Sequence, residues 1–445
     1  MTRPIRPPRA VPWVRRVADF ARHLADLKVD RYEGTTGRQE REQVFRTAVA
    51  LIGPVVEQVL DELGALYLAG AAEISFEWVS DEGDLEAAWC LGWPDQRSAR
   101  RRAGVVGPET VGPIVISAIF PAGWTHGHLR GAHVGHWPLQ VLDASDAARQ
   151  YEVLWAAAEA ELHEWIYSTD RPWERVTPGD LPQLVAHTMP GGRLKAELRA
   201  DRTVRGIFVT GRSPVDVLAA AAAARLDFVV IDREHAPSPS DDELAALCEI
   251  GFLRGIAVLV RIGAPLPHLA SGALDIGAAG VVVPQCRTAE EVRSVVEACY
   301  LPPTGRRGFS PRTRAARRAA DALPGAPFGQ LVAAVNAATA VVVQVETPEL
   351  LEGLPSLVDE GRVDAYLLGA HDLAIASGTP DADMTVTALG EMHRVLRPAG
   401  RAWGFVTRGG EEQSAAARQA RFRIVGSESA LLAAAIAGTT KERSA

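Results

Sequence analysis

Titratable and amide side chains follow a series of short apolar runs in the second half of the chain. They are Asp232, Glu234, His235, Arg261, Gln285, Gln344, Glu346, His371 and Asp372. Each lies at or just after the carboxyl end of its run, and nothing comparable lies at the amino ends. If the runs are parallel strands, their carboxyl ends meet at one edge of a sheet, where α/β folds carry their chemistry. We therefore expect these side chains to converge on one site.

Glu346 and Asp372 are the pair best suited to holding a divalent metal ion. Carboxylates are hard oxygen donors, and two of them leave coordination positions for water and substrate, which is how Mg²⁺ or Mn²⁺ is usually held. The same pair could instead cap a helix or form ion pairs, and Arg261 could simply neutralise Glu346. His235 could likewise do no more than form hydrogen bonds at a helix start. The residue types alone leave these alternatives open.

Eight apolar runs rich in Val and Ile would position these side chains. They span residues 204–209, 228–232, 257–261, 280–284, 341–346, 365–369, 402–406 and 422–425. Amphipathic segments rich in Ala, Leu and Glu, typical of helices, lie between them. Eight strands alternating with helices over about 250 residues predict a (β/α)8 TIM barrel. The connection over residues 301–327 is longer than the others, and we expect it to form a flap over the mouth of the barrel.

The tryptophans indicate another domain before the barrel. Nine of the ten lie in the first 173 residues, and residues 171–192 are rich in proline and glycine, as a linker is. A chain of 445 residues also suits two or three domains. We expect a smaller α+β domain over residues 1–170, a linker over 171–192 and the TIM barrel over 193–445.

Composition and charge exclude several classes of partner. A net charge of −8 argues against a nucleic acid, because phosphate binding needs a basic face. No run approaches the ~20 apolar residues that span a bilayer, and no apolar segment of an export signal follows the basic start. The four cysteines lack Cys-x-x-Cys spacing, so neither a zinc site nor a disulfide framework is expected. We expect a cytoplasmic protein with no membrane partner.

Six segments of the predicted barrel resemble, in order and spacing, the HpcH/HpaI aldolase family. They are residues 232–237 (Asp-Arg-Glu-His-Ala-Pro), 260–261 (Val-Arg), 274–284, 302–308, 344–347 (Gln-Val-Glu-Thr) and 368–373 (Leu-Gly-Ala-His-Asp-Leu). The similarity covers roughly residues 194–439. This family comprises metal-dependent class II pyruvate aldolases, which include 4-hydroxy-2-oxo-acid aldolases.

The resemblance implies a role for each polar residue of these segments. The metal ligands would be Glu346 and Asp372, and the catalytic residues His235, Arg261, Asp232 and Asp275. The ion would be Mg²⁺ or Mn²⁺, with Co²⁺ as an alternative, and would act as a Lewis acid. Arg261 would face the keto oxygen. His235 would move the hydroxyl proton of the aldol in either direction, oriented by Asp232 or Asp275.

Substrate binding would involve Gln344, Ala370, His371 and Arg307. Backbone N–H groups near Ala370, at a helix start, suit the carboxylate of pyruvate. His371 departs from the family pattern, and it could contact the substrate, become an extra metal ligand or be solvated. Arg307 could recognise a carboxylate or phosphate on the substrate, or it could belong to a solvated run of arginines.

Lysine is scarce, which bears on the type of aldolase. None of Lys28, Lys195 and Lys441 lies in or after a predicted barrel strand. A Schiff-base aldolase needs a lysine inside the barrel, so the chemistry would have to be assisted by a metal ion. No nucleotide cofactor is expected.

A histidine-rich stretch lies in the first domain and could form a second site. His126, His128, His133 and His136 fall within eleven residues. A His-x-His pair on a strand places two imidazoles on one face, which could begin a transition-metal site. The alternative is a glycine-rich loop whose histidines pack and form hydrogen bonds, since no carboxylate or cysteine completes a familiar ligand spacing.

The sequence thus predicts a two-domain enzyme that makes or breaks a carbon–carbon bond between the enolate of pyruvate, a 2-oxo acid, and an aldehyde. Three alternatives stay open: a lyase of the citrate or malyl-CoA type, an inactive barrel serving as a scaffold for the first domain, and a first domain that is itself catalytic. The resemblance also implies a homo-oligomer formed through the barrel domain. Its apolar last helix, residues 427–437, would pack on a neighbouring subunit.

Overall fold

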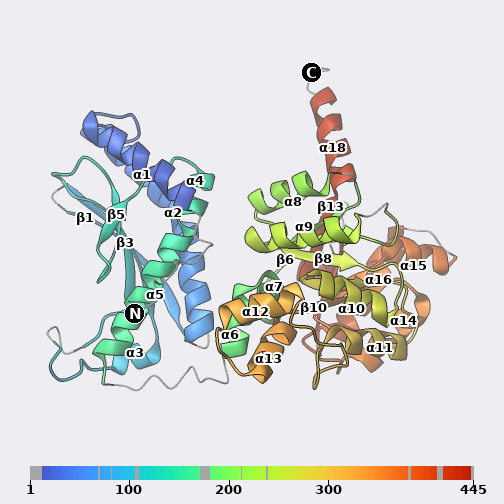
Figure 1. The fold of residues 1–445 in the computed structure, drawn as a ribbon. Coiled ribbons are helices and arrows are strands. Elements are labelled where there is room, and N and C mark those ends of the chain that lie inside the picture. Colours follow the sequence, from blue (N-terminus) through green and yellow to red (C-terminus); the bar gives the residue numbers. More distant parts are fainter. Residues whose placement is uncertain are drawn as a thin grey trace. The chain divides into compact units, whose positions relative to one another are not determined.

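The computed structural model describes residues 13–68, 71–81, 83–105, 110–170, 181–211, 213–236, 239–378, 382–407 and 414–441. The chain divides into two units, Met1–Thr177 and Pro178–Ala445 (Figure 1). Each unit buries a hydrophobic core of its own.

The first unit is built on a five-stranded antiparallel sheet whose strands are ordered as in the sequence. The strands are β1 (Glu73–Asp81), β2 (Asp84–Gly92), β3 (Ile114–Phe120), β4 (His128–Gly131) and β5 (His136–Pro138). The helices are α1 (Trp13–Lys28), α2 (Arg38–Tyr67), α3 (Pro94–Ser98), α4 (Ala144–Arg149) and α5 (Tyr151–Ser168). The predicted α+β architecture of this part of the chain is confirmed.

The core of the first unit is shared between the helices and the sheet. Ile52, Val56 and Leu60 recur at helical spacing on α2 and are fully buried. Trp89 of β2 and Ile116 of β3 are buried in the same cluster. In β2 every second residue is buried, because successive side chains of a strand point to opposite faces of a sheet.

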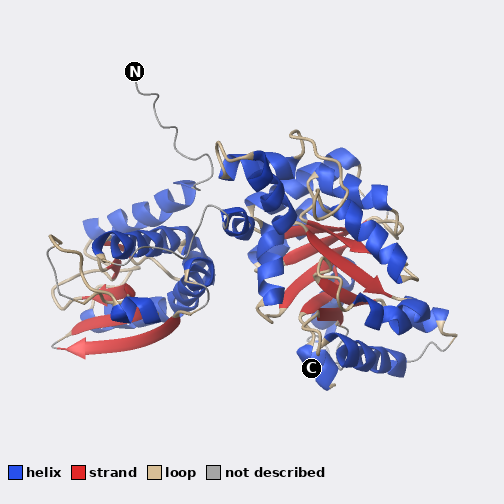
Figure 2. Ribbon diagram, turned by 90° about the horizontal axis from the view of Figure 1, so that it is seen from below, coloured by secondary structure: helices blue, strands red, loops and turns tan. Residues whose placement is uncertain are grey.

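The second unit is a closed barrel of parallel strands surrounded by helices (Figure 2). The strands are β6 (Val204–Val209), β7 (Phe228–Asp232), β8 (Ala257–Arg261), β9 (Gly280–Val283), β10 (Ala340–Val345), β11 (Ala365–Leu368), β12 (Ala402–Val406) and β13 (Phe422–Ser427). They coincide with the eight predicted runs, and the TIM-barrel prediction is confirmed. Every residue of β7 to β11 is buried, because a parallel barrel covers both faces of its strands.

The helices of the second unit begin and end at positions that the sequence marks locally. They are α6 (Leu181–Thr188), α7 (Pro190–Arg199), α8 (Pro214–Ala223), α9 (Asp241–Leu253), α10 (Pro267–Ile276), α11 (Ala289–Cys299), α12 (Arg314–Ala322), α13 (Phe328–Ala338), α14 (Pro348–Gly353), the 3₁₀ helix η1 (Leu354–Leu357), α15 (Ala370–Ala376), α16 (Ala382–Leu396), α17 (Ala415–Gln419) and α18 (Glu428–Lys441). Capping boxes at Ser240 and Thr288 start α9 and α11. Each hydroxyl accepts from the backbone N–H of a glutamate three residues on, and the carboxylate of that glutamate accepts from the backbone N–H of the capping residue.

The segment expected as a linker, residues 171–192, ends inside the second unit. Residues 171–180 lie outside the described residues, and α6 with the start of α7 forms the rest. Met189 is buried in a cluster with Leu301 and Val335. These apolar contacts make the second half of the segment part of the barrel unit.

Helix α7 and its Lys195 lie at the amino end of the barrel. The ammonium of Lys195 donates to the carbonyl of Thr339 at 2.6 Å and forms an ion pair with Asp364 at 3.4 Å. Thr339 and Asp364 directly precede β10 and β11. Lys195 therefore lies at the opposite end from the polar residues that follow the strands.

The long segment over residues 301–327 does not cover the mouth of its own barrel, contrary to expectation. Arg314 and Arg318 of α12 donate to the carbonyls of Ile276 and Gly277, at the end of α10. The physical reason is the direction of the chain. Helix α11 has already returned it to the amino end before this segment begins, and β10 starts from that end.

Candidate active site

The barrel brings several of the predicted residues together at the carboxyl ends of its strands. Asp232 is the last residue of β7 and Arg261 the last residue of β8, and the two are paired in the strand register. Glu346 directly follows β10. Asp372 lies in the first turn of α15, which begins two residues after β11 ends. Parallel strands in register thus place residues distant in sequence at one end of the barrel.

Arg261 is held by two acidic residues. Its Nε and Nη2 donate to the two carboxylate oxygens of Asp232 at 2.9 and 2.7 Å, and its Nη1 lies 3.1 Å from Glu234 Oε2. All three side chains are almost fully buried. Burial alone would raise the pKa of Asp232, but the hydrogen bonds and charge of Arg261 outweigh it and hold that pKa below its usual value. A bidentate pair of this kind fixes the direction of the guanidinium.

Asp232 also shapes the turn that carries His235. Its Oδ1 accepts the backbone N–H groups of Glu234 and His235, at 3.0 and 3.4 Å. The imidazole of His235 is 60% exposed, and its Nε2 lies 3.7 Å from Glu234 Oε2. The predicted acid–base residue therefore lies at the open end of the site, where it can exchange protons with solvent.

Glu346 is a buried carboxylate surrounded by negative charge. Its Oε1 accepts the backbone N–H of Gln285, and its Oε2 accepts the side-chain amide of Gln344. Burial raises the pKa of Glu346 to about 7, and the charges of Glu234 and Asp372 add to the effect. Asp372 and Glu234 therefore lie close enough for their charges to act on Glu346.

The residues present fit a divalent cation. The carboxylates around Glu346 carry more negative charge than Arg261 neutralises, and the buried Gln344 Oε1 has no hydrogen-bond partner within the described part of the chain. Among the described residues, no three His, Cys, Asp or Glu side chains stand together as a complete ligand set. Glu346 and Asp372 would therefore supply two ligands, with the rest coming from substrate and water, as is common for Mg²⁺.

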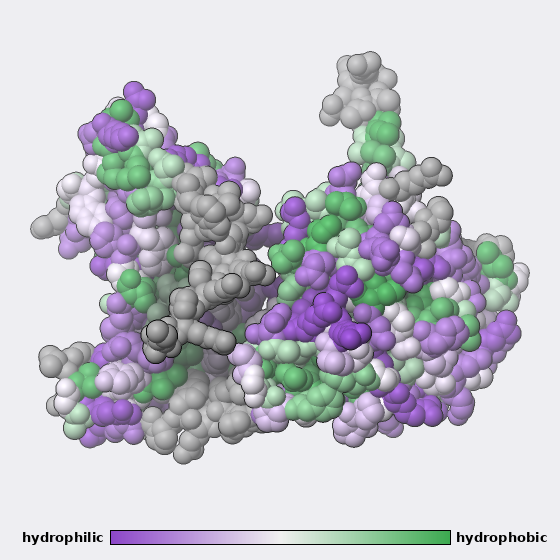
Figure 3. All heavy atoms as spheres, in the orientation of Figure 1, coloured by the Kyte–Doolittle hydropathy of each residue, from purple (hydrophilic) through white to green (hydrophobic). Residues whose placement is uncertain are grey.

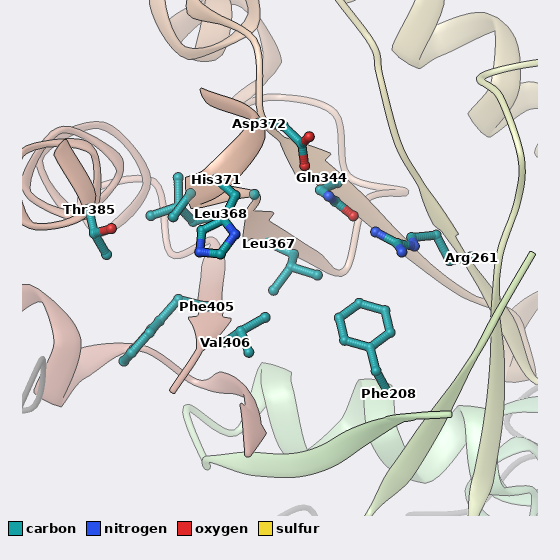
Figure 4. A pocket seen from close by; sticks show the side chains of 12 residues that line it. Phe208, Arg261, Gln344, Leu367, Leu368, His371, Asp372, Thr385, Phe405 and Val406 are labelled. Atoms are coloured by element: carbon teal, nitrogen blue, oxygen red, sulfur yellow. The ribbon is translucent and has the colours of Figure 1, made fainter. Parts of the chain in front are cut away.

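A pocket of about 160 Å³ opens beside these carboxylates (Figure 4). It is lined by Phe208, Arg261, Gln344, Leu367, Leu368, Gly369, Ala370, His371, Asp372, Thr385, Phe405 and Val406. Its polar side is formed by Arg261, Gln344 and His371, and aromatic rings close the other side. The predicted substrate-binding residues Gln344, Ala370 and His371 thus share one cavity with the predicted metal ligand Asp372.

Two predicted site residues, Asp275 and Arg307, lie elsewhere. Arg307 is 4% exposed and donates its Nε and Nη2 to Asp275 Oδ1 at 3.0 and 2.8 Å. Asp275 lies in the last turn of α10, which runs back to the amino end of the barrel. Within one chain, Asp275 therefore does not orient His235, and Arg307 is engaged in an ion pair at the other end of the barrel from the pocket.

Glu234 and Gln285 both contribute to the site, although the sequence indicates no specific role for either. The side-chain amide of Gln285 donates to Glu234 Oε1 at 2.6 Å. Glu234 in turn contacts Arg261. Their positions two residues after β7 and β9 were visible in the sequence, but the contacts between them depend on the closed barrel.

The histidines of the first unit form a different group from the predicted one. The ring of His128 lies 5.0 Å from that of His136, and His23 of α1 lies 4.9 Å from His126, measured between ring centroids. His133 instead contacts Glu161 of α5, with Nδ1 2.6 Å from the carboxylate. The four predicted histidines do not form a ligand set in the part of the chain that the structure describes. The rings of His126, His128 and His136 pack, and His133 binds Glu161, which is the alternative expected for a glycine-rich loop.

A parallel eight-stranded barrel with a buried arginine and carboxylates at its carboxyl ends defines the class of the protein: a (β/α)8 enzyme. A family model described as HpcH/HpaI aldolase/citrate lyase matches residues 205–435. The chain belongs to this family. The predicted family and the prediction of an enzyme acting on carbon–carbon bonds are thereby confirmed.

Several relatives that are similar to the chain carry aldolase names. A 4-hydroxy-2-oxovalerate aldolase from Rhodococcus jostii (strain RHA1) is 33% identical over 190 residues, which are 42% of this chain and 70% of the relative. A 2-keto-3-deoxy-L-rhamnonate aldolase from Escherichia coli (strain K12) is 32% identical over 192 residues, 42% of this chain and 68% of the relative. The crystal structure of an HpcH/HpaI aldolase from Desulfitobacterium hafniense DCB-2 aligns with a TM-score of 0.49 at 25% identity, covering 56% of this chain and 96% of the other.

Proposed function

We propose that the barrel is a metal-dependent aldolase that joins the enolate of pyruvate to an aldehyde, or cleaves the product. The observation that carries this proposal is the buried, partly unneutralised group of carboxylates around Glu346, which lies beside the guanidinium of Arg261. The carboxylates favour binding of a cation, and the guanidinium favours an oxyanion. A 2-oxo acid passing through its enolate needs both.

Glu346 and Asp372 would hold Mg²⁺ or Mn²⁺, with Co²⁺ as an alternative. The ion would supply Lewis-acid polarisation of the keto group of the substrate. Arg261 would donate to the keto oxygen, where negative charge develops, because Asp232 keeps the guanidinium fixed. Gln344 would hold the substrate beside Glu346 by accepting a hydrogen bond from its hydroxyl group, since the buried Oε1 has no hydrogen-bond partner among the described residues.

Proton transfer in the cleavage direction is assigned to His235. Its imidazole would take the proton of the C4 hydroxyl, the C3–C4 bond would break, and the electron pair would pass to the enolate oxygen near Arg261. Return of a proton to C3 gives pyruvate and the aldehyde. Backbone N–H groups at Ala370 would bind the pyruvate carboxylate, and His371 would contact the substrate from the pocket wall.

The test is pyruvate release from a panel of 4-hydroxy-2-oxo acids, with EDTA and with Mn²⁺ added back. We expect activity that EDTA removes and Mn²⁺ restores. Replacing Arg261 by Lys keeps the charge but loses the bidentate contact, and we expect kcat to fall by about 100-fold or more. Arg233→Lys is the control, because this partly exposed neighbour forms its ion pair with the exposed Asp241. Activity that is indifferent to EDTA would contradict the proposal.

A lyase of the citrate or malyl-CoA type is the second candidate, because the matching family model covers citrate lyases as well. His235 favours the aldolase, since it supplies an acid–base group at the open end of the site. Release of acetyl-CoA or an equivalent thioester product, without turnover of any 4-hydroxy-2-oxo acid, would decide for the lyase.

We also propose that the barrel unit forms a homo-oligomer through α18. Leu431, Leu432 and Ile436 are 41%, 62% and 57% exposed on this helix. In Figure 3 hydrophobic surface covers part of the described length of α18. Apolar side chains of this size in one helix favour a partner surface. A sedimentation measurement that finds only monomers at micromolar concentration would contradict it.

Within the described residues, no helix has the length and apolar character to cross a bilayer.

A further inference from the structure

Gln285 has an unusual backbone conformation for its position. It follows β9 by two residues and has a φ of 58°, in the left-handed region that side chains other than glycine seldom adopt. The other described non-glycine residues with positive φ are Asp30, Glu33, Asp201 and Arg225. Gln285 alone among these five lies at the carboxyl ends of the barrel strands. Such a conformation persists only where the surrounding structure demands it.

The conformation lets one residue contact two acids. The backbone N–H of Gln285 donates to Glu346 Oε1, and its side-chain Nε2 donates to Glu234 Oε1 at 2.6 Å. Glu346 is the proposed metal ligand. Glu234 contacts Arg261, which faces the proposed keto oxygen. Gln285 therefore contacts both the proposed metal ligand, Glu346, and the acid that pairs with Arg261, Glu234.

We propose that Gln285 is a positioning residue that aligns the metal ligand Glu346 with the Glu234–Arg261 pair; this rests on the aldolase function proposed above. The left-handed backbone presents its N–H to Glu346, and the side chain holds Glu234 toward Arg261. The two contacts have separate consequences. The backbone contact sets the affinity for the metal ion, and the side-chain contact sets the rate of the chemical step.

Two substitutions separate these contacts. Gln285→Gly keeps the N–H and adopts positive φ readily, but it removes the side-chain amide. We expect its Kd for Mn²⁺, measured without substrate by electron paramagnetic resonance, to stay within about twofold of the wild type, while kcat for pyruvate release falls about tenfold. Gln285→Val removes the amide and also resists positive φ, because its branched Cβ clashes there. We expect its Mn²⁺ affinity to fall about tenfold or more as well.

Arg225 provides the matched controls. It also has a positive φ, of 56°, but it is exposed and lies before β7, at the amino end of the barrel. Arg225→Gly and Arg225→Val should leave both the Mn²⁺ affinity and kcat unchanged. They separate the general strain of a valine at positive φ from an effect on the site.

The outcomes distinguish this inference from the proposed function. If the wild-type chain binds no Mn²⁺, the proposed function fails. If the wild type binds Mn²⁺ but Gln285→Gly weakens binding as much as Gln285→Val, or if neither variant changes Kd or kcat, the inference is wrong. Should Gln285→Val fail to fold, Gln285→Gly still decides through its separate effects on Kd and kcat.

Discussion

Glu346 is the residue on which the chemistry of the site most depends. It is 3% exposed, it accepts bonds from two amide groups among the described residues, and nearby acids oppose its ionisation. A buried acid in such surroundings keeps its proton to a higher pH than in water. Its ordinary pKa of 4.5 is raised to about 7.

Metal binding should therefore depend on pH through Glu346. Because the ligand must lose its proton to bind Mn²⁺, the affinity should rise about tenfold per pH unit up to about pH 7 and then level off. Isothermal titration with Mn²⁺ between pH 5.5 and 8 measures this. A flat affinity across that range would contradict the assignment.

The stability of the metal-free protein should change with pH in the opposite direction to the metal affinity. Between pH 4.5 and 7 the folded state keeps a proton on Glu346 that the unfolded state has released, so Glu346 makes the protein less stable as pH rises through this window. Glu346→Gln does not titrate and lacks this dependence. The difference in Tm between Glu346→Gln and the wild type, measured with EDTA, should therefore grow in favour of the variant from pH 4.5 to 7.

At the scale of elements, the junction of β11 and α15 controls how closely two strands approach at the site. Gly369 directly follows β11 and precedes the α15 turn that carries Asp372. A Cβ at Gly369 would lie 2.6 Å from Glu346 Cβ and 2.7 Å from its Oε2. The absence of a side chain here leaves room for the carboxylate of Glu346.

Gly369→Ala should therefore displace Glu346 while the barrel still folds. We expect the Mn²⁺ affinity and kcat/KM to fall about tenfold or more, because small misplacements of a first ligand are costly. Gly361→Ala is the control, since an added Cβ there meets nothing within 4 Å. Equal effects of the two substitutions would show that the clash with Glu346 is relieved at no cost.

The histidine group of the first unit should make the stability of that unit depend on pH. Burial, followed by the nearby His136 and His23, lowers the pKa of His128 to about 4. Between pH 6.5 and 4 the unfolded state therefore binds a proton that folded His128 excludes, so stability is lost as pH falls through this window. His128→Phe should reduce that loss, whereas replacement of the exposed His163 should not. Tryptophan fluorescence reports on this unit, because nine of the ten tryptophans lie in the first 173 residues.

At the scale of the whole molecule, the division into two units predicts that the barrel folds without the first unit. Residues 178–445 contain the complete barrel core and every proposed site residue. We expect this fragment to bind Mn²⁺ and release pyruvate with a kcat close to that of the full chain. A fragment that folds but binds no Mn²⁺ would show that the first unit contributes to the site.

A fragment that begins at residue 193 is the matched control for the boundary. It lacks α6, Met189 and the first residues of α7, including Gly191. Met189 is buried against Leu301 and Val335, and Gly191 lies against the backbone of Ala279 and Ala338. Losing these contacts should lower Tm by several degrees relative to the fragment that begins at residue 178, on the order of 1–3 kcal/mol of stability.

The sequence by itself determined the barrel and the end of the barrel that carries its chemistry. Runs of buried Val and Ile ending in Asp232, Arg261 and Glu346 are local patterns, and parallel strands leave little freedom in where their carboxyl ends lie. The α+β character of the first unit likewise followed from alternation along its strands.

Only the tertiary structure decided which polar groups meet. The pairing of Asp275 with Arg307, and the inclusion of His23 in place of His133 in the histidine group, depend on distances between segments far apart in the chain. The contact of Gln285 with both Glu234 and Glu346 further depends on a backbone conformation that glutamine rarely adopts. Hydrophobic periodicity reports burial along one element, and it carries no information about which side chain of another element lies opposite.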